Sequence, residues 1–133
     1  MGFLDNLFGA GNAPIHPDWK VLSTIEQLDE VVEGSKKKPV VLFKHSTTCG
    51  ISAGAKHALE SKWDFAAGDL DFYYLDLLNL RPISNEIASR FGVIHQSPQI
   101  IVIADGKAVF DTSHHRISAD TLRGALESAN QGS

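Results

Sequence analysis

The segment PVVLFKHSTTCGIS, residues 39–52, contains the pattern that decides the fold of this chain. It opens with an apolar run, residues 39–44, that is rich in β-branched side chains and typical of a buried strand. Helical spacing resumes at about Gly50 and ends before Asp64, with an expected inner face made by Ile51, Ala55, Ala58 and Leu59. The segment therefore predicts a strand, a polar turn and a helix, with Cys49 at the start of that helix.

Outward from this segment, turn and cap residues divide the chain into further helices and strands. Before the segment we expect a helix that is capped by Ser23 or Thr24, runs through Glu33 and is closed by Gly34. After it we expect a buried strand over 72–76, a helix that follows Pro82 and stops at Gly92, and two strands over 99–104 and 107–111 joined by Asp105-Gly106. A last helix begins at Ser118, and a polar tail covers 130–133.

This order of elements predicts the fold class. Two strand–helix units with a right-handed crossover give the parallel part of a sheet, and the hairpin adds antiparallel strands, so helices must cover both faces. The arrangement is that of an α/β thioredoxin-like fold with a mixed central sheet and extra N-terminal elements. We expect an N-terminal extension over residues 1–18 and a thioredoxin-like domain over 19–130.

Composition excludes several classes of protein. The 133 residues, 43% of them hydrophobic, are enough for one domain with a core. The net charge of −4 is spread along the chain, and the only basic run is Lys36 to Lys38, so we expect no nucleic-acid partner. No apolar stretch approaches the roughly 20 residues that span a bilayer, and residues 1–9 lack the regions of a signal peptide. One cysteine cannot form an internal disulfide, so we expect a cytoplasmic protein. We also expect a monomer with no membrane partner.

Cys49 is the residue that could carry chemistry. Unpaired N–H groups and the positive end of the dipole at a helix start stabilise a thiolate, and Lys44 and His45 could add positive potential. A free cysteine can instead be an inert core residue. Because the approach to Cys49 is polar and other residues supply the inner helix face, we interpret this thiol as an acidic nucleophile.

Ser52 stands three residues after Cys49, where a dithiol oxidoreductase has its second cysteine. The reaction of Cys49 would therefore need an outside thiol to complete exchange. Two roles remain open for the Ser52 hydroxyl, which could donate a hydrogen bond to the thiolate or only support the first helical turn.

Two other segments could contribute to binding. Ser97-Pro98 precedes a strand and suits a cis proline whose neighbouring backbone pairs with an extended ligand, although a trans turn is the commoner case, and the Cys49 context favours cis. The run His114-His115-Arg116 could hold the carboxylates of an anionic thiol, or form a solvated turn. The histidines have no spacing typical of a metal site, so we expect no metal.

The runs 43–49, 51–52, 97–99 and 111–114 together resemble the monothiol bacilliredoxin family related to the bacillithiol-system protein YtxJ, over roughly residues 19–127. The resemblance implies removal of bacillithiol from mixed disulfides on other proteins, with Cys49 as nucleophile, bacillithiol as co-substrate and no bound cofactor. We expect thiolated proteins and a small thiol as partners, and substrate contacts from Lys44, His45, Thr48, Gly50, Ser52, Ser97, Pro98 and His114.

Gly50 departs from this pattern, because the family commonly has proline after the cysteine. Cys-Gly-Ile-Ser is similar to the Cys-Gly-Phe-Ser of monothiol glutaredoxins, which carry a [2Fe-2S] cluster, and glycine would free the loop. The region 111–115 lacks the Gly-Gly-Cys-Asp segment that holds glutathione in those proteins. We therefore rank a reductase first and a cluster carrier second, with a non-enzymatic redox adaptor using the Pro98 edge as a third class.

Overall fold

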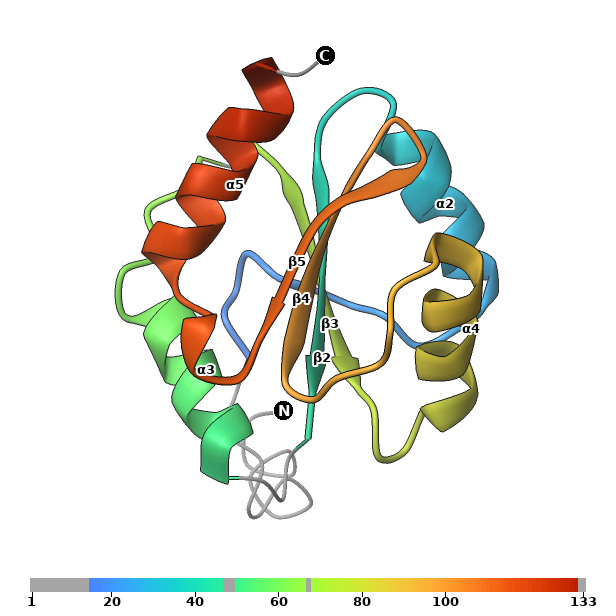
Figure 1. Cartoon of the computed structure of the whole chain (residues 1–133), viewed down its shortest axis with the longest axis horizontal. Coiled ribbons are helices and arrows are strands. Elements are labelled where there is room, and N and C mark those ends of the chain that lie inside the picture. The colour runs from blue at the N-terminus through green and yellow to red at the C-terminus, as the bar shows by residue number, and fades with distance from the viewer. Residues whose placement is uncertain (1–14, 47–49, 67, 132–133) are drawn as a thin grey trace.

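A computed structural model describes residues 15–46, 50–66 and 68–131 and contains one five-stranded sheet. The strand order is β1-β3-β2-β4-β5, in which the first three are parallel and β4 and β5 run antiparallel to their neighbours (Figure 1). The strands are β1 (Lys20–Val21), β2 (Val40–His45), β3 (Asp71–Asp76), β4 (Gln99–Ala104) and β5 (Lys107–Ser113). The predicted mixed sheet is confirmed.

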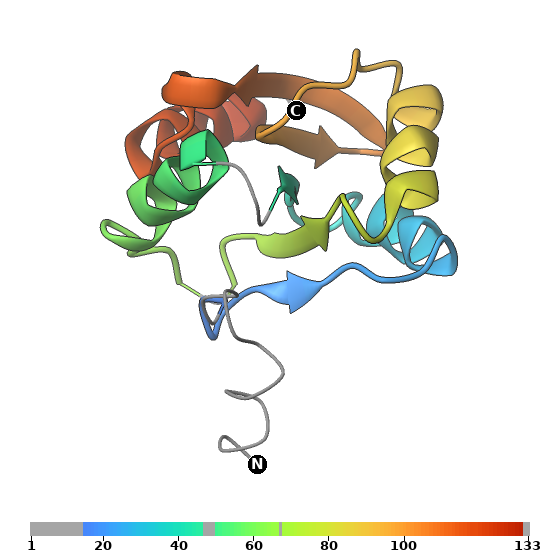
Figure 2. The same ribbon diagram turned by 90° about the horizontal axis from the view of Figure 1, so that it is seen from below.

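Helices cover both faces of this sheet, as Figures 1 and 2 show from two directions. On one face lie α3 (Gly50–Glu60) and α5 (Ala119–Gln131), and on the other lie α2 (Glu26–Gly34) and α4 (Arg81–Phe91). Alternate residues of β2 enter the two cores: Phe43 packs towards α3 and α5, and Leu42 towards α2 and α4. Both faces of the central strands are thus buried, which explains their nearly continuous apolar sequences.

Local capping and turn chemistry explain where most elements begin and end. Thr24 and Gln27 bond reciprocally at the start of α2, with Gln27 N donating to Thr24 Oγ1 at 3.3 Å and Thr24 N donating to Gln27 Oε1 at 2.9 Å. Gly92 ends α4 with a left-handed φ of 67°, as expected. At the hairpin, Asp105 and Gly106 have φ of 53° and 79°, which matches the twist that a two-residue turn needs between these strands.

Several boundaries differ from the sequence predictions. Gly34 is the last residue of α2 and Ser35 continues in a right-handed conformation, so the predicted glycine closure is wrong. α5 continues to Gln131, which makes part of the expected polar tail helical. β1 and the short 3-10 helix η1 (His114–Arg116) were not predicted, because two or three residues are too few for a periodic pattern.

The inner face of α3 is also shifted from its predicted position. Ile51 is 43% exposed, and Ser52 is buried in its place together with Ala55 and Leu59. The helix is therefore rotated so that a serine, rather than the isoleucine, faces the sheet in its first turn. This rotation places the Ser52 hydroxyl within hydrogen-bond distance of Ser46, the residue that follows β2.

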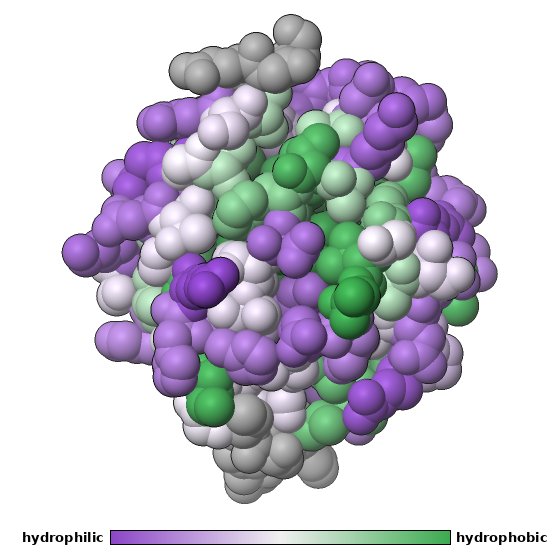
Figure 3. Space-filling view, in the orientation of Figure 1, coloured by the Kyte–Doolittle hydropathy of each residue, from purple (hydrophilic) through white to green (hydrophobic). Residues whose placement is uncertain are grey.

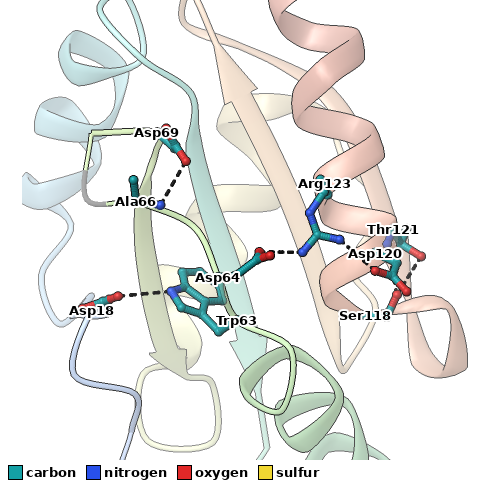
Figure 4. A network of polar contacts seen from close by, with 9 residues as sticks. All are labelled: Asp18, Trp63, Asp64, Ala66, Asp69, Ser118, Asp120, Thr121 and Arg123. Carbon is teal, nitrogen blue, oxygen red and sulfur yellow. Dashed lines mark hydrogen bonds and ion pairs between the residues drawn. The ribbon is translucent and has the colours of Figure 1, made fainter.

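Polar contacts join the connection from α3 to β3 to the segment before β1 and to α5 (Figure 4). Arg123 of α5 forms ion pairs with Asp64 at 2.6 Å and Asp120 at 2.8 Å, while Trp63 Nε1 donates to Asp18 at 3.2 Å. These groups are largely exposed, so each contact contributes little free energy. The Arg123–Asp64 pair connects the segment after α3 to α5.

Candidate active site at the start of α3

The turn that carries Cys49 lies between β2 and α3. Residues 47–49, and so both Cys49 and Thr48, lie outside the described residues. The two flanks of the turn are joined by a hydrogen bond in which Ser46 N donates to Ser52 Oγ at 3.1 Å. Both serines are buried. Of the two roles left open for Ser52, support of the first helical turn is the one with an observed contact.

Ser97-Pro98 lies beside the end of β2, because Gln99 pairs with Lys44 in the antiparallel β2–β4 register. The peptide bond between the two residues is cis, which confirms the prediction. Pro98 O accepts a hydrogen bond from His114 N at 3.1 Å, and Gln99 lies opposite Ser113 in the β4–β5 register. The chain segment that begins η1 is therefore attached to the proline segment through backbone atoms.

Gly50 and His114 are brought together although they are distant in sequence. They line opposite sides of one cavity, which has a volume of about 330 Å³ and lies between the first turns of α3 and η1. Gly50 is the first residue of α3, and a β carbon placed on it meets no atom within 4 Å. This glycine is therefore not required by close packing among the described residues.

Lys44 lies on the face of the sheet that packs against α4, because it alternates with Phe43 and His45 along β2. Its side chain is fully buried, and its Nζ donates to Ser84 O at 3.2 Å and lies 3.3 Å from His95 Nδ1. Burial lowers the pKa of Lys44 to about 8. The expectation that Lys44 adds positive potential on the α3 side is not supported by this placement.

His45 occupies the α3 side of β2, and its ring lies 5.5 Å from that of Phe43 and 5.3 Å from that of Tyr74. Only 5% of the residue is exposed, and its Nδ1 has no hydrogen-bond partner within the described part of the chain. Burial, followed by the charge of Lys56, lowers the pKa of His45. A neutral imidazole at neutral pH cannot supply the positive potential that the sequence suggested.

Sequence reasoning missed the polar groups that hold the segment before Pro98. Gln99 Nε2 donates to Ile94 O at 3.0 Å, and Gln99 Oε1 accepts from Gln96 N at 3.3 Å. Ile94 itself is 82% exposed. Figure 3 shows hydrophobic surface between the positions that β5 and α4 occupy in Figure 1. The glutamine after Pro98 was visible in the sequence, but nothing in its spacing indicated that it bonds back across the proline.

Two further observations concern the described residues as a whole. Over 15–46, 50–66 and 68–131, no three histidine, cysteine, aspartate or glutamate side chains gather as they would around a metal ion. Over the same ranges, no helix has both the length and the apolar character to cross a membrane.

Comparison with known proteins places the chain in a family. The family described as monothiol bacilliredoxin BrxC matches residues 20–122. A solved structure of a candidate oxidoreductase with a thioredoxin fold has 34% sequence identity and a TM-score of 0.67, over 81% of this chain and 93% of that one.

Two thioredoxins show the shared fold at lower identity. A Malassezia sympodialis thioredoxin is 20% identical with a TM-score of 0.66, over 89% of this chain and 96% of that one. Spinach chloroplast thioredoxin f is 19% identical with a TM-score of 0.64, over 89% and 98%. With its sheet order, its cis proline and the match over residues 20–122, the chain belongs to the monothiol bacilliredoxin BrxC family of thioredoxin-fold proteins.

Proposed function

We propose that this protein is a monothiol disulfide reductase that removes a low-molecular-weight thiol, bacillithiol or a close analogue, from mixed disulfides on other proteins. Cys49 is the nucleophile. The observation that carries this proposal is Ser52, whose buried hydroxyl accepts from Ser46 N one turn after the cysteine. A serine there leaves the chain without a second thiol, so an external thiol must complete the reaction.

The reaction consists of two thiol-disulfide exchanges. The Cys49 thiolate attacks the small thiol's sulfur in the mixed disulfide, a new S–S bond forms to Cys49, and the target protein leaves as a thiolate that takes a proton from water. A second small thiol, as thiolate, then attacks the disulfide on Cys49. The products are a disulfide of two small thiols and the restored Cys49 thiolate, so the second thiol supplies the electrons.

The surroundings of the reaction follow from the same chemistry. The partners are thiolated proteins and the small thiol, and the compartment is the reducing cytoplasm, where a single reactive cysteine stays reduced. We propose that the protein acts as a monomer, because one thiol per chain is sufficient for both exchanges.

The test uses the purified full chain and a test protein that carries bacillithiol on one cysteine. We expect the adduct to move to Cys49, as read by intact mass, and a second thiol to release it. The Cys49→Ser variant should leave the test protein unchanged. Failure of transfer, together with a stoichiometric Cys49-dependent [2Fe-2S] cluster after anaerobic reconstitution, would instead favour the cluster-carrier function that Gly50 suggested.

A further inference from the structure

The cavity between α3 and η1 joins residues that the sequence suggested separately, namely the glycine after Cys49 and the two histidines after β5. It has a volume of about 330 Å³, at the lower end of the roughly 300–1,000 Å³ that small-molecule pockets occupy. α3 contributes Gly50, Ile51 and Gly54 to its wall, and the opposite side consists of His114, His115 and Ile117. The cavity starts at the residue that follows Cys49 in sequence.

Apart from Ile51, the α3 residues that line the cavity are glycines and alanines, which leave its α3 side open. A β carbon built on Gly50 or on Gly54 meets no atom within 4 Å, so the space beside each glycine is open. A ligand can therefore approach the backbone of the first two turns of α3. A larger side chain at position 54 can occupy the same space.

The opposite side carries nitrogen donors that are held in place. His114 has a left-handed φ of 56°, its N donates to Pro98 O at 3.1 Å, and its O accepts from Ile117 N at 3.3 Å. Ile117 is buried, which anchors the far end of η1. The two imidazoles therefore project from a fixed turn, and Arg116 lies between them and the buried isoleucine in sequence.

The charge of the lining favours an anion. None of the described residues that line the cavity is acidic, and both polar side chains among them are histidines. An imidazole N–H donates to a carboxylate, and such a bond strengthens when the ring is protonated. The small residues of α3 leave space for the carbon skeleton of the ligand.

We propose that this cavity binds the non-sulfur part of a carboxylate-bearing small thiol, with His114 and His115 donating to the carboxylate. This inference rests on the proposed reductase function and adds the location and the charge of the thiol that it removes. A thiol held here presents its sulfur towards the start of α3. Exchange then transfers the small thiol, and not the target protein, to Cys49.

The test compares three thiols as mixed disulfides on one test protein: mercaptosuccinate, 2-mercaptoethanol and cysteamine, which are anionic, neutral and cationic. We measure the rate of adduct formation on Cys49 by intact mass. The wild type should react about tenfold faster with the mercaptosuccinate disulfide than with the 2-mercaptoethanol disulfide, as expected for hydrogen bonds to a charged group. Joint replacement of His114 and His115 by alanine should bring that ratio close to one.

Gly54→Leu tests the space independently of charge. It should slow reaction with the mercaptosuccinate disulfide, while alkylation of Cys49 by iodoacetamide shows that the thiol is intact. Gly124→Leu is the matched control, because Gly124 lies on α5 and a β carbon there also meets no atom within 4 Å.

The possible outcomes separate this inference from the proposed function. If the wild type takes adducts from all three disulfides at similar rates, or the preference survives both the double histidine change and Gly54→Leu, the cavity is not the thiol site and the reductase function stands. If the wild type takes no adduct from any disulfide, including that of bacillithiol, both proposals are overturned.

Discussion

Lys44 and His45 are adjacent on β2, and both are basic residues that fold into the interior, yet they lie in different environments. Lys44 is fully buried against α4, where its Nζ donates to Ser84 O and lies 3.3 Å from His95 Nδ1. His45 is buried against α3, where its ring contacts Phe43 and Tyr74 and its Nδ1 has no partner within the described residues. One basic group has polar neighbours, and the other has an unpartnered nitrogen.

This difference shows why closeness to Cys49 in sequence does not establish a role beside it. Successive side chains of a strand point to opposite faces, so Lys44 faces away from the helix that follows Cys49. His45 is on the correct face, but burial lowers its pKa and favours the neutral ring. The N-terminus of α3 can still supply electrostatic support for a thiolate.

The largest effect that we expect concerns the buried charge of Lys44. Its pKa falls from 10.5 to about 8, and at about 1.4 kcal/mol per pKa unit this corresponds to roughly 3 kcal/mol. Between pH 8 and 10.5 the unfolded chain binds a proton that the folded chain has released, so stability should rise with pH in that window. Relative to Lys44→Met, the wild type should therefore gain most of this free energy between about pH 8 and 10.

Urea unfolding of both proteins at about pH 7, 8, 9 and 10 measures this gain as a change in the difference between them. Lys37→Met is the control, because Lys37 is exposed and its removal should give no comparable trend. A constant difference between wild type and Lys44→Met over this range would mean that the lysine keeps its proton in the folded state.

Much of the fold was predictable because local chemistry specifies it. The alternation of core residues in β2, the left-handed Gly92 and the Asp105-Gly106 turn each depend on a few adjacent residues. The rotation of α3 was not predictable in the same way. Ile51 and Ser52 are both compatible with helical spacing, and the packing of α3 against the sheet decides which of them is buried.

The site was less predictable, because its contacts join distant segments. The sequence identified Ser97-Pro98 and the histidines after β5 separately, but the bond between Pro98 O and His114 N exists only once β4 and β5 pair. The partners of Lys44 come from α4 and from the segment after it. No spacing within residues 39–52 could indicate them.

The next effect concerns the α3 side of the same comparison, where the Ser52 hydroxyl joins the start of α3 to the residue that follows β2. Ser52→Ala removes the acceptor of Ser46 N and leaves a buried donor without that bond. We expect a loss of about 1–3 kcal/mol in the free energy of unfolding, measured by urea titration. Ser89→Ala is the control, because Ser89 is a helical serine at an exposed position of α4. Equal stability of the two variants would show that water replaces the Ser46–Ser52 bond.

The smallest expected effect is a gain in stability on replacing His45 with an apolar ring. His45→Phe removes a buried nitrogen that has no partner within the described residues and keeps aromatic contacts with Phe43 and Tyr74, so we expect about 1 kcal/mol of stabilisation at about pH 8. Because the folded pKa of His45 lies below its ordinary value of 6.5, the unfolded chain binds the proton first as the pH falls, and the wild type loses stability there.

The free energy of unfolding of His45→Phe should therefore exceed that of the wild type by more at about pH 5 than at about pH 8, as measured by thermal or urea unfolding. His57→Phe, at an exposed position of α3, controls for the loss of a histidine and should show no such growth. If His45→Phe destabilises the protein at both pH values, the contact of the imidazole with the Ser52 backbone outweighs the cost of its burial. His45 would then support the first turn of α3, and its contrast with Lys44 would be one of function as well as of environment.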